Sequence, residues 1–245
     1  MAADPRVSAD PHHLGYPALT PINLKRQKAS FISMDDPEHA RQRRMVTAPF
    51  AIKRIEAFRP AVQKIVDGLI DDMLAGPKPV DLVEAFALPV PSLVISEMLG
   101  VPYDNHEFFQ ENSKTIIKRT ATPEQRMSAH EALTAYLDRL VGEKLDNPAD
   151  DLLSELGKRV KAGELTQLDA AQTGKLLLIA GHQTTANMIA LGTLALLRNP
   201  GQLALLRESD DPKLVASTVE ELLRYLNVVH NGGGAPRRRT SRSPA

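Results

Sequence analysis

The stretch LLLIAGHQTTANMIALGTLALL, residues 176–197, is apolar at both ends and small or polar in its middle. Apolar residues cover most of its circumference, which predicts a helix that needs neighbours on all sides. Upstream, Thr166 and Asp169 have the spacing of a capping box, and downstream the Asn-Pro-Gly at 199–201 stops a helix. We therefore expect one long helix from about residue 168 to residue 198.

Helical spacing of apolar residues continues along most of the chain, whereas no alternating run is long enough to predict a strand. Pro60 is expected to kink or interrupt one of the helices. Residues 1–35 are rich in proline and are expected to form a loop. The sequence thus predicts a mostly α fold, with the other helices at 37–50, 52–74, 88–102, 106–119, 123–145, 148–163, 201–208 and 212–226.

Composition excludes several functions. The 245 residues contain no cysteine, which rules out disulfides, iron–sulfur clusters and cysteine nucleophiles. The formal net charge is zero and tryptophan is absent, so neither nucleic acid nor an anionic membrane is an expected partner. The N-terminus lacks the basic and apolar regions of a signal peptide, and a cytoplasmic protein is expected.

The Gly-His-Gln-Thr-Thr segment at 181–185 has two interpretations. It can be a small-residue packing face, in which hydroxyls bond to carbonyls one turn earlier, and spacing alone favours this. It can also be a ligand site, because the Thr184 hydroxyl can reach the Ala180 carbonyl and bend the helix. In that interpretation Gly181 leaves room for a bulky ligand beside the backbone. His182 is expected to pack rather than to bind iron.

The second interpretation gains support from a resemblance. AGHQTT at 180–185 resembles the central helix of the cytochrome P450 haem-thiolate monooxygenases, whose pattern is Ala/Gly-Gly-x-acid-Thr-Thr/Ser. DPEHARQRR at 36–44 resembles the helix that holds the haem propionates, and VEELLRYL at 219–226 the helix with Glu-x-x-Arg. ALPVPSLVISEMLGVPY at 87–103 is similar to soluble actinobacterial members. The four matches stand in family order.

The resemblance implies a partial cytochrome P450 fold with a haem cofactor, a small hydrophobic substrate and a ferredoxin-type electron donor. The chain would retain the helical core and lack most of the sheet and the haem-thiolate loop. By position, the resemblance assigns Thr184 and Gln183 to catalysis, Glu221 and Arg224 to a structural ion pair, and His39, Arg43, Ala180 and Gly181 to the haem.

Three departures from the family pattern qualify this expectation. The family's iron ligand is a cysteine beyond Glu-x-x-Arg, and this chain has none, so a thiolate-ligated haem is excluded. The sequence opens on a segment that in the family follows an N-terminal sheet and two helices, so the chain is expected to be truncated at both ends. Gln183 replaces the acid, and an amide can orient a water but cannot transfer its proton.

The last residues, 231–245, are expected to form a disordered basic tail beyond a partial P450 domain at 1–230. Their Pro, Arg and Ser are typical of GC-rich coding DNA read out of frame, so a frameshift origin is one hypothesis. Arg237 in this tail is a candidate counterpart of a third propionate ligand.

Three functions therefore remain open at the level of sequence. The chain can be an inactive fragment of a bacterial P450 monooxygenase. It can be a haem-free helical binding module, or a haem sensor or carrier with a histidine ligand.

Overall fold

The computed structural model describes residues 7–12, 30–118 and 120–229. Within these residues every regular element is helical, which confirms the predicted mostly α fold. The α-helices are α1 (Glu38–Met45), α2 (Ile52–Ala75), α3 (Pro89–Leu99), α4 (His106–Ile117), α5 (Pro123–Asp146), α6 (Leu152–Lys161), α7 (Gln167–Arg198), α8 (Pro200–Glu208) and α9 (Pro212–Tyr225). Short helical turns lie at Phe31–Ser33, Ala48–Phe50, Val83–Ala87 and Tyr103–Asn105.

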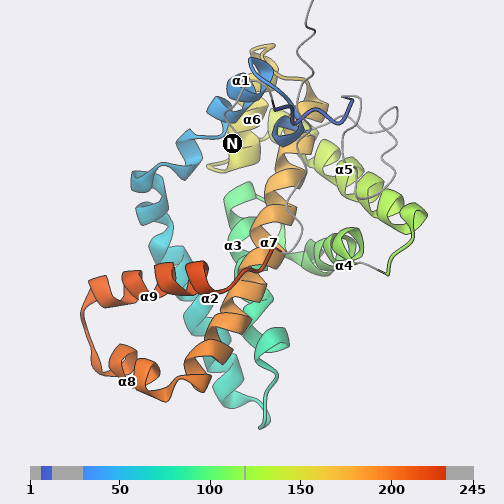
Figure 1. Ribbon diagram of the computed structural model, residues 1–245. Helices are drawn as coiled ribbons and strands as arrows, with labels where there is room; N and C mark the ends of the chain where they lie inside the picture. Colours follow the sequence, from blue (N-terminus) through green and yellow to red (C-terminus); the bar gives the residue numbers. More distant parts are fainter. Residues whose placement is uncertain (1–6, 13–29, 119, 230–245) are drawn as a thin grey trace, which may run out of the picture.

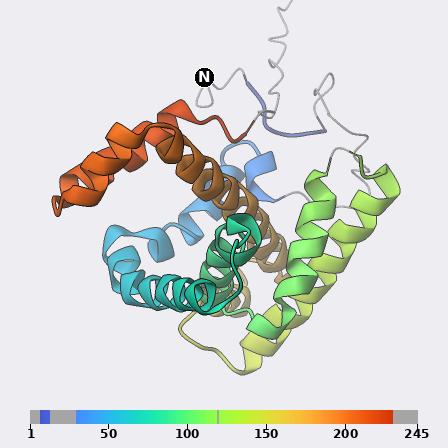
Figure 2. The same cartoon turned by 90° about the horizontal axis from the view of Figure 1, so that it is seen from below.

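Helix α7 runs through the length of the molecule, and the other helices are arranged around it (Figure 1). Its N-terminal half packs against α5 and α6, and α3 crosses its middle. Seen from below, α4 and α5 lie to one side of α7 and α2 lies to the other (Figure 2). The core is formed where α3 to α7 meet, and its largest fully buried side chains are Leu99, Leu133, Leu137, Leu153, Leu156 and Val141.

Local sequence signals fix the ends of the core helices. Thr166 Oγ1 accepts from the Asp169 amide at 3.1 Å, and the Asp169 carboxylate accepts from the Thr166 amide at 3.0 Å, so the predicted capping box is confirmed. Helix α3 ends at Gly100, whose φ of 74° is left-handed and suits glycine. A Cβ on Gly100 would stand 2.2 Å from the Asp151 side chain, so this turn also needs the missing atom.

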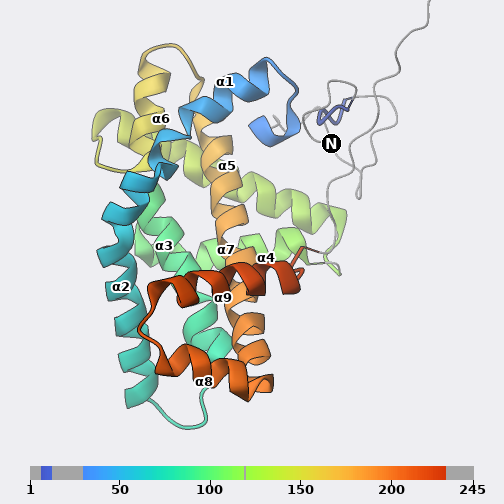
Figure 3. The ribbon, with the colours of Figure 1, turned by 60° about the vertical axis from the view of Figure 1, so that its left-hand side comes forward.

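The C-terminal helices are less well covered than the core. Neither α8 nor α9 contains a buried residue. Figure 3 shows α9 crossing α7, and the two meet at Gly192, where a Cβ would lie 3.4 Å from Leu222 Cδ1. This end of α7 is therefore packed against only a few neighbours.

Two details differ from the sequence prediction. Pro60 does not break the predicted helix at 52–74, because α2 continues as one helix from Ile52 to Ala75. Val83–Ala87 forms a single wide π-turn that no periodic pattern signalled. The expected tail at 231–245, with Arg237, lies outside the described residues.

Among the described helices none alone has the length and apolarity to cross a membrane, and α7 with α8 does so only as a pair bent by 105°.

Candidate functional site on the open face of α7

Helix α7 has one buried face and one open face. With 100° between successive residues, Lys175, Leu178, His182 and Ala186 fall on one side, and all four are buried. Ala180, Thr184, Asn187, Leu191 and Leu194 fall together on another side, where Thr184 is half-buried and the other four are exposed. Ala180 and Thr184, both from the AGHQTT motif, therefore share the open face.

The Thr184 hydroxyl donates to the Ala180 carbonyl at 2.6 Å, which confirms the hydrogen bond expected from the sequence. This bond uses the hydroxyl proton and leaves the oxygen lone pairs directed away from the helix. Gln183 is the preceding residue and is half-buried. The open face thus presents the Thr184 hydroxyl oxygen and the Asn187 amide among apolar side chains, with the Gln183 amide one residue away from Thr184.

Gly181 does not have the expected role of leaving room for a ligand. A Cβ on Gly181 would lie 3.3 Å from Ile95 Cδ1 and 3.5 Å from Ile95 Cγ1. The space beside this glycine is therefore filled by a side chain of α3. Gly181 therefore allows α7 and α3 to pack closely. This agrees with the first interpretation of residues 181–185, in which the segment is a small-residue packing face.

His182 packs in the interior, as expected, and is only 3% exposed. Desolvation lowers its pKa, and a hydrogen bond with the Leu88 backbone opposes this shift. Its Nε2 has no hydrogen-bond partner among the described residues. Because it lies on the buried side of α7, it faces away from Thr184.

Helix α1 places its two candidate propionate ligands differently. His39 is half-buried, its Nδ1 donates to the Phe31 carbonyl at 2.9 Å, and its ring contacts the Phe31 ring edge to face. Arg43, one turn later, has an exposed side chain. The sequence placed both residues on one helix face, and the structure keeps them on one continuous helix.

Arg41, a residue of α1, connects this helix to the turn before α7. This guanidinium binds the Glu38 carboxylate at 2.6 and 2.8 Å and donates to the Glu164 carbonyl at 2.7 Å, in the turn before α7. Hydrogen bonds from Arg41 and Gln42 lower the pKa of Glu38 to about 2. Arg41 therefore ties the helix carrying His39 and Arg43 to the start of α7.

Glu221 and Arg224 form the expected ion pair on α9. Two hydrogen bonds of 2.6 and 2.7 Å join the guanidinium to the carboxylate, and they lower the pKa of Glu221. The side chains of Glu221 and Arg224 are 61% and 71% exposed, so solvent screens the pair and its contribution to stability is small. Arg237 lies outside the described residues.

Sequence reasoning missed a buried polar cluster between α5 and α7. Lys175 is only 7% exposed, and its Nζ donates to Thr134 Oγ1 at 2.8 Å. Burial lowers the pKa of Lys175 to about 8. Burial and the charge of Lys175 lower the pKa of His130 to about 4, and His130 Nδ1 has no partner among the described residues. The only sequence signal was a lysine within an apolar helix.

The amino-acid sequence of this chain is similar to those of several characterised proteins. The chain is 58% identical to cytochrome P450 GfsF of Streptomyces halstedii over 233 residues, which are 94% of this chain and 56% of GfsF. It is 52% identical to cytochrome P450 CYP105Q4 of Mycobacterium marinum, covering 95% of this chain and 57% of the relative. No protein-family model matches the chain.

The solved structures agree with these relatives. The crystal structure of GfsF matches 95% of this chain and 61% of its own chain with a TM-score of 0.82 at 56% identity. The mycinamicin VIII C21 methyl hydroxylase MycCI of Micromonospora griseorubida matches 91% of this chain and 56% of its own with a TM-score of 0.83 at 40% identity. The chain spans little more than half the length of the relatives it matches. With the motifs and the helical arrangement in agreement, the chain is similar over nearly its whole length to the helical part of cytochrome P450s.

Proposed function

We propose that this chain is the helical part of a haem-thiolate monooxygenase and supplies the wall of the reaction chamber formed by the open face of α7. The substrate is a small hydrophobic molecule, the electron donor is a ferredoxin-type protein, and the location is the cytoplasm. The single observation that carries the proposal is the Thr184–Ala180 hydrogen bond on an open helix face that is apolar apart from Thr184 and Asn187. The relative MycCI is a methyl hydroxylase, which supports the proposed reaction class.

The chemistry of the residues themselves suggests a role in positioning water or substrate. Because the Thr184 proton is donated to Ala180, the Thr184 oxygen accepts a hydrogen bond from a water or a polar ligand group on the open face. The amide of Gln183 can orient such a water but cannot act as an acid or a base. We infer that Thr184 positions a water or a polar ligand group on the open face and that Gln183 orients this water. Proton delivery is then weaker than with a carboxylate at position 183.

The haem of the family does not fit the residues of this chain on their own. The 245 residues contain no cysteine to serve as the thiolate ligand. His39 and Arg43 remain candidates for the propionates. However, His39 already donates through Nδ1 to Phe31, so it can donate through Nε2 to a carboxylate only when the ring is protonated. We therefore propose that the chain alone is inactive.

A haem titration tests this proposal. The purified chain is mixed with haem, reduced and exposed to carbon monoxide, and the Soret band is recorded. We expect no strongly red-shifted band of the thiolate type, and observing one would refute the proposal. A shifted band that disappears in His39→Ala would instead favour a histidine-ligated sensor or carrier. A flat titration together with tight binding of a small apolar ligand would favour a haem-free binding module.

A further inference from the structure

A pocket of about 360 Å³ lies between α3, α4 and the π-turn at Val83–Ala87, and it is defined here as the α3–α4 pocket. From α4, His106, Gln110 and Lys114 line it as one stripe, because they are four residues apart on the helix. From α3 comes Ser92, which is only 5% exposed. The volume lies within the range of small-molecule sites, about 300–1,000 Å³.

Two opposite charges line this pocket without pairing. Lys114 lies on α4 and Glu84 on the π-turn, and among the described residues neither side chain has a hydrogen bond or an ion pair. The Gln110 amide, one turn before Lys114, also has no partner in this part of the chain. Wide π-turns occur frequently at functional sites, and this one places Glu84 at the pocket. The α3–α4 pocket thus offers a cation, an anion and an amide to a ligand.

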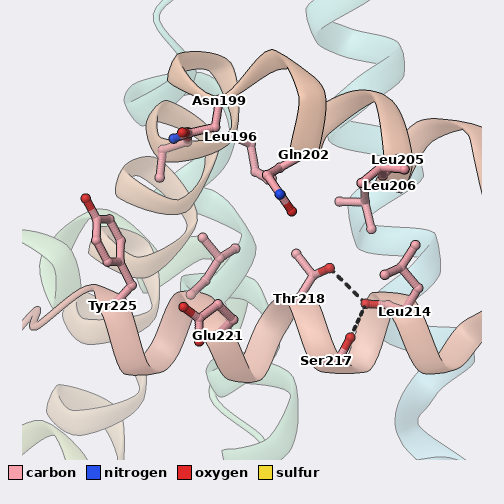
Figure 4. Close-up of a pocket in the computed structure, with 12 residues that line it drawn as sticks. Leu196, Asn199, Gln202, Leu205, Leu206, Leu214, Ser217, Thr218, Glu221 and Tyr225 are labelled. Carbon is pink, nitrogen blue, oxygen red and sulfur yellow. Dashed lines mark hydrogen bonds between the residues drawn. The ribbon is translucent and has the colours of Figure 1, made fainter.

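The groove between α7, α8 and α9 has a different lining (Figure 4). There the Ser217 and Thr218 hydroxyls already donate to the Leu214 carbonyl, at 3.0 and 2.8 Å. The charged residue of that lining, Glu221, pairs with Arg224. These polar groups are therefore satisfied within α9, whereas the charges of the α3–α4 pocket have no partner among the described residues.

The α3–α4 pocket is separate from the open face of α7. Its lining includes Leu88, whose backbone forms a hydrogen bond with His182. His182 and Thr184 are about 200° apart around α7, so the pocket lies on nearly the opposite side from Thr184. A ligand of this pocket is therefore a different molecule from the one that the open face positions.

We propose that the α3–α4 pocket binds a small zwitterion, an α-amino acid with an apolar side chain. Lys114 and the Gln110 amide donate to its carboxylate, and Glu84 accepts from its ammonium group. Leu88 and Leu93 offer apolar surface to its side chain. A ligand with one charge would leave either Glu84 or Lys114 without a partner, so the pair selects for both charges.

Three probes of similar shape separate the two charge contacts. L-Leucine carries both charges, L-leucinamide lacks the carboxylate, and 4-methylpentanoate lacks the amine. Each is titrated into the uniformly ¹⁵N-labelled full chain, and backbone and glutamine side-chain amide shifts give the site and the Kd. L-Leucine should shift the signals of Gln110 and of residues 83–87 in a saturable way. The other two probes should bind about fivefold more weakly, since each loses one partly exposed charge contact.

Substitutions assign each charge to its partner. Lys114→Met should weaken L-leucine binding about fivefold and narrow its difference from L-leucinamide, because the carboxylate loses its cation. Glu84→Gln should do the same and narrow the difference from 4-methylpentanoate. Lys161→Met and Glu111→Gln remove the same charges from exposed helix positions outside the pocket, and both should leave the Kd unchanged.

The proposal is overturned if L-leucine gives no saturable shifts up to its solubility limit, or if the shifts lie away from the pocket. It is also overturned if the three probes bind equally, because recognition would then rest on the apolar side chain alone. The titration contains no haem and reads residues remote from Thr184, so its result is independent of the proposed function.

Discussion

Replacing Lys175 by methionine should stabilise the protein at neutral pH. Lys175 is 7% exposed, and burial lowers its pKa from 10.5 to about 8. At 1.36 kcal/mol per pKa unit, keeping this amine charged in the folded state costs about 3 kcal/mol. The substitution also removes the hydrogen bond to Thr134, worth about 1 kcal/mol. Thr134 still donates to the His130 carbonyl at 2.7 Å, so the net gain at pH 7 is about 2 kcal/mol.

The pH dependence distinguishes this mechanism from a general packing effect. Because the folded-state pKa lies below the unfolded-state pKa, the unfolded chain binds more protons between about pH 8 and pH 10.5. The wild-type protein therefore gains stability as the pH rises through this window, and the Lys175→Met variant does not. Above it the amine is neutral in both states, and the wild type should be the more stable by the hydrogen bond alone.

Urea unfolding followed by far-UV circular dichroism measures both effects, with exposed Lys161→Met as the control for losing one positive charge. Titrations of the other lysines and tyrosines are common to all three proteins and cancel in the differences. The reasoning is refuted if Lys175→Met is less stable than wild type at pH 7. It is equally refuted if the difference stays constant from pH 7 to pH 11.

Three further predictions can be tested by urea unfolding or by dye fluorescence. His130 has a folded-state pKa of about 4 against 6.5, so stability should fall by up to about 3 kcal/mol as the pH drops through this range, and His130→Leu should flatten the fall. Gly174→Ala would place a Cβ 2.8 Å from Cδ2 of fully buried Leu153 and should cost about 1–3 kcal/mol in urea unfolding. Gly68→Ala, also mid-helix but with nothing within 4 Å, should instead gain up to about 1 kcal/mol, and equal effects would contradict the packing argument. The folded chain should bind a hydrophobic dye at the exposed leucines Leu191, Leu194 and Leu197 of α7, and Leu194→Asp should reduce the dye fluorescence more than Lys161→Asp.

The sequence predicted those features that depend on neighbouring residues. The capping box at Thr166 involves atoms only a few residues apart, so local chemistry sufficed. The Thr184–Ala180 bond spans one helical turn and was predicted for the same reason. The family resemblance supplied the order of the helices, which the solved relatives confirm.

Features that depend on which helix packs where could not be predicted. The space beside Gly181 is filled by Ile95, some 86 positions earlier in the chain, and helical spacing alone carries no information about that contact. The burial of Lys175 likewise follows from the packing of α5 on α7. A lysine can extend to solvent from most helix positions, so only the assembled fold shows that this one does not. The roles of His39, Arg43 and Gln183 in a haem site stay predictions.

The uneven burial of the helices also sets the order in which the structure opens. Helices α3 to α7 share the core, whereas α8 and α9 contain no buried residue and the Glu221–Arg224 pair is open to water. Amide hydrogens in α8 and α9 should therefore exchange with solvent through local unfolding, long before those of α5 or the first half of α7. Proteases in the cell should likewise cut there first, so the lifetime of this chain would be set by its C-terminal helices rather than by its core.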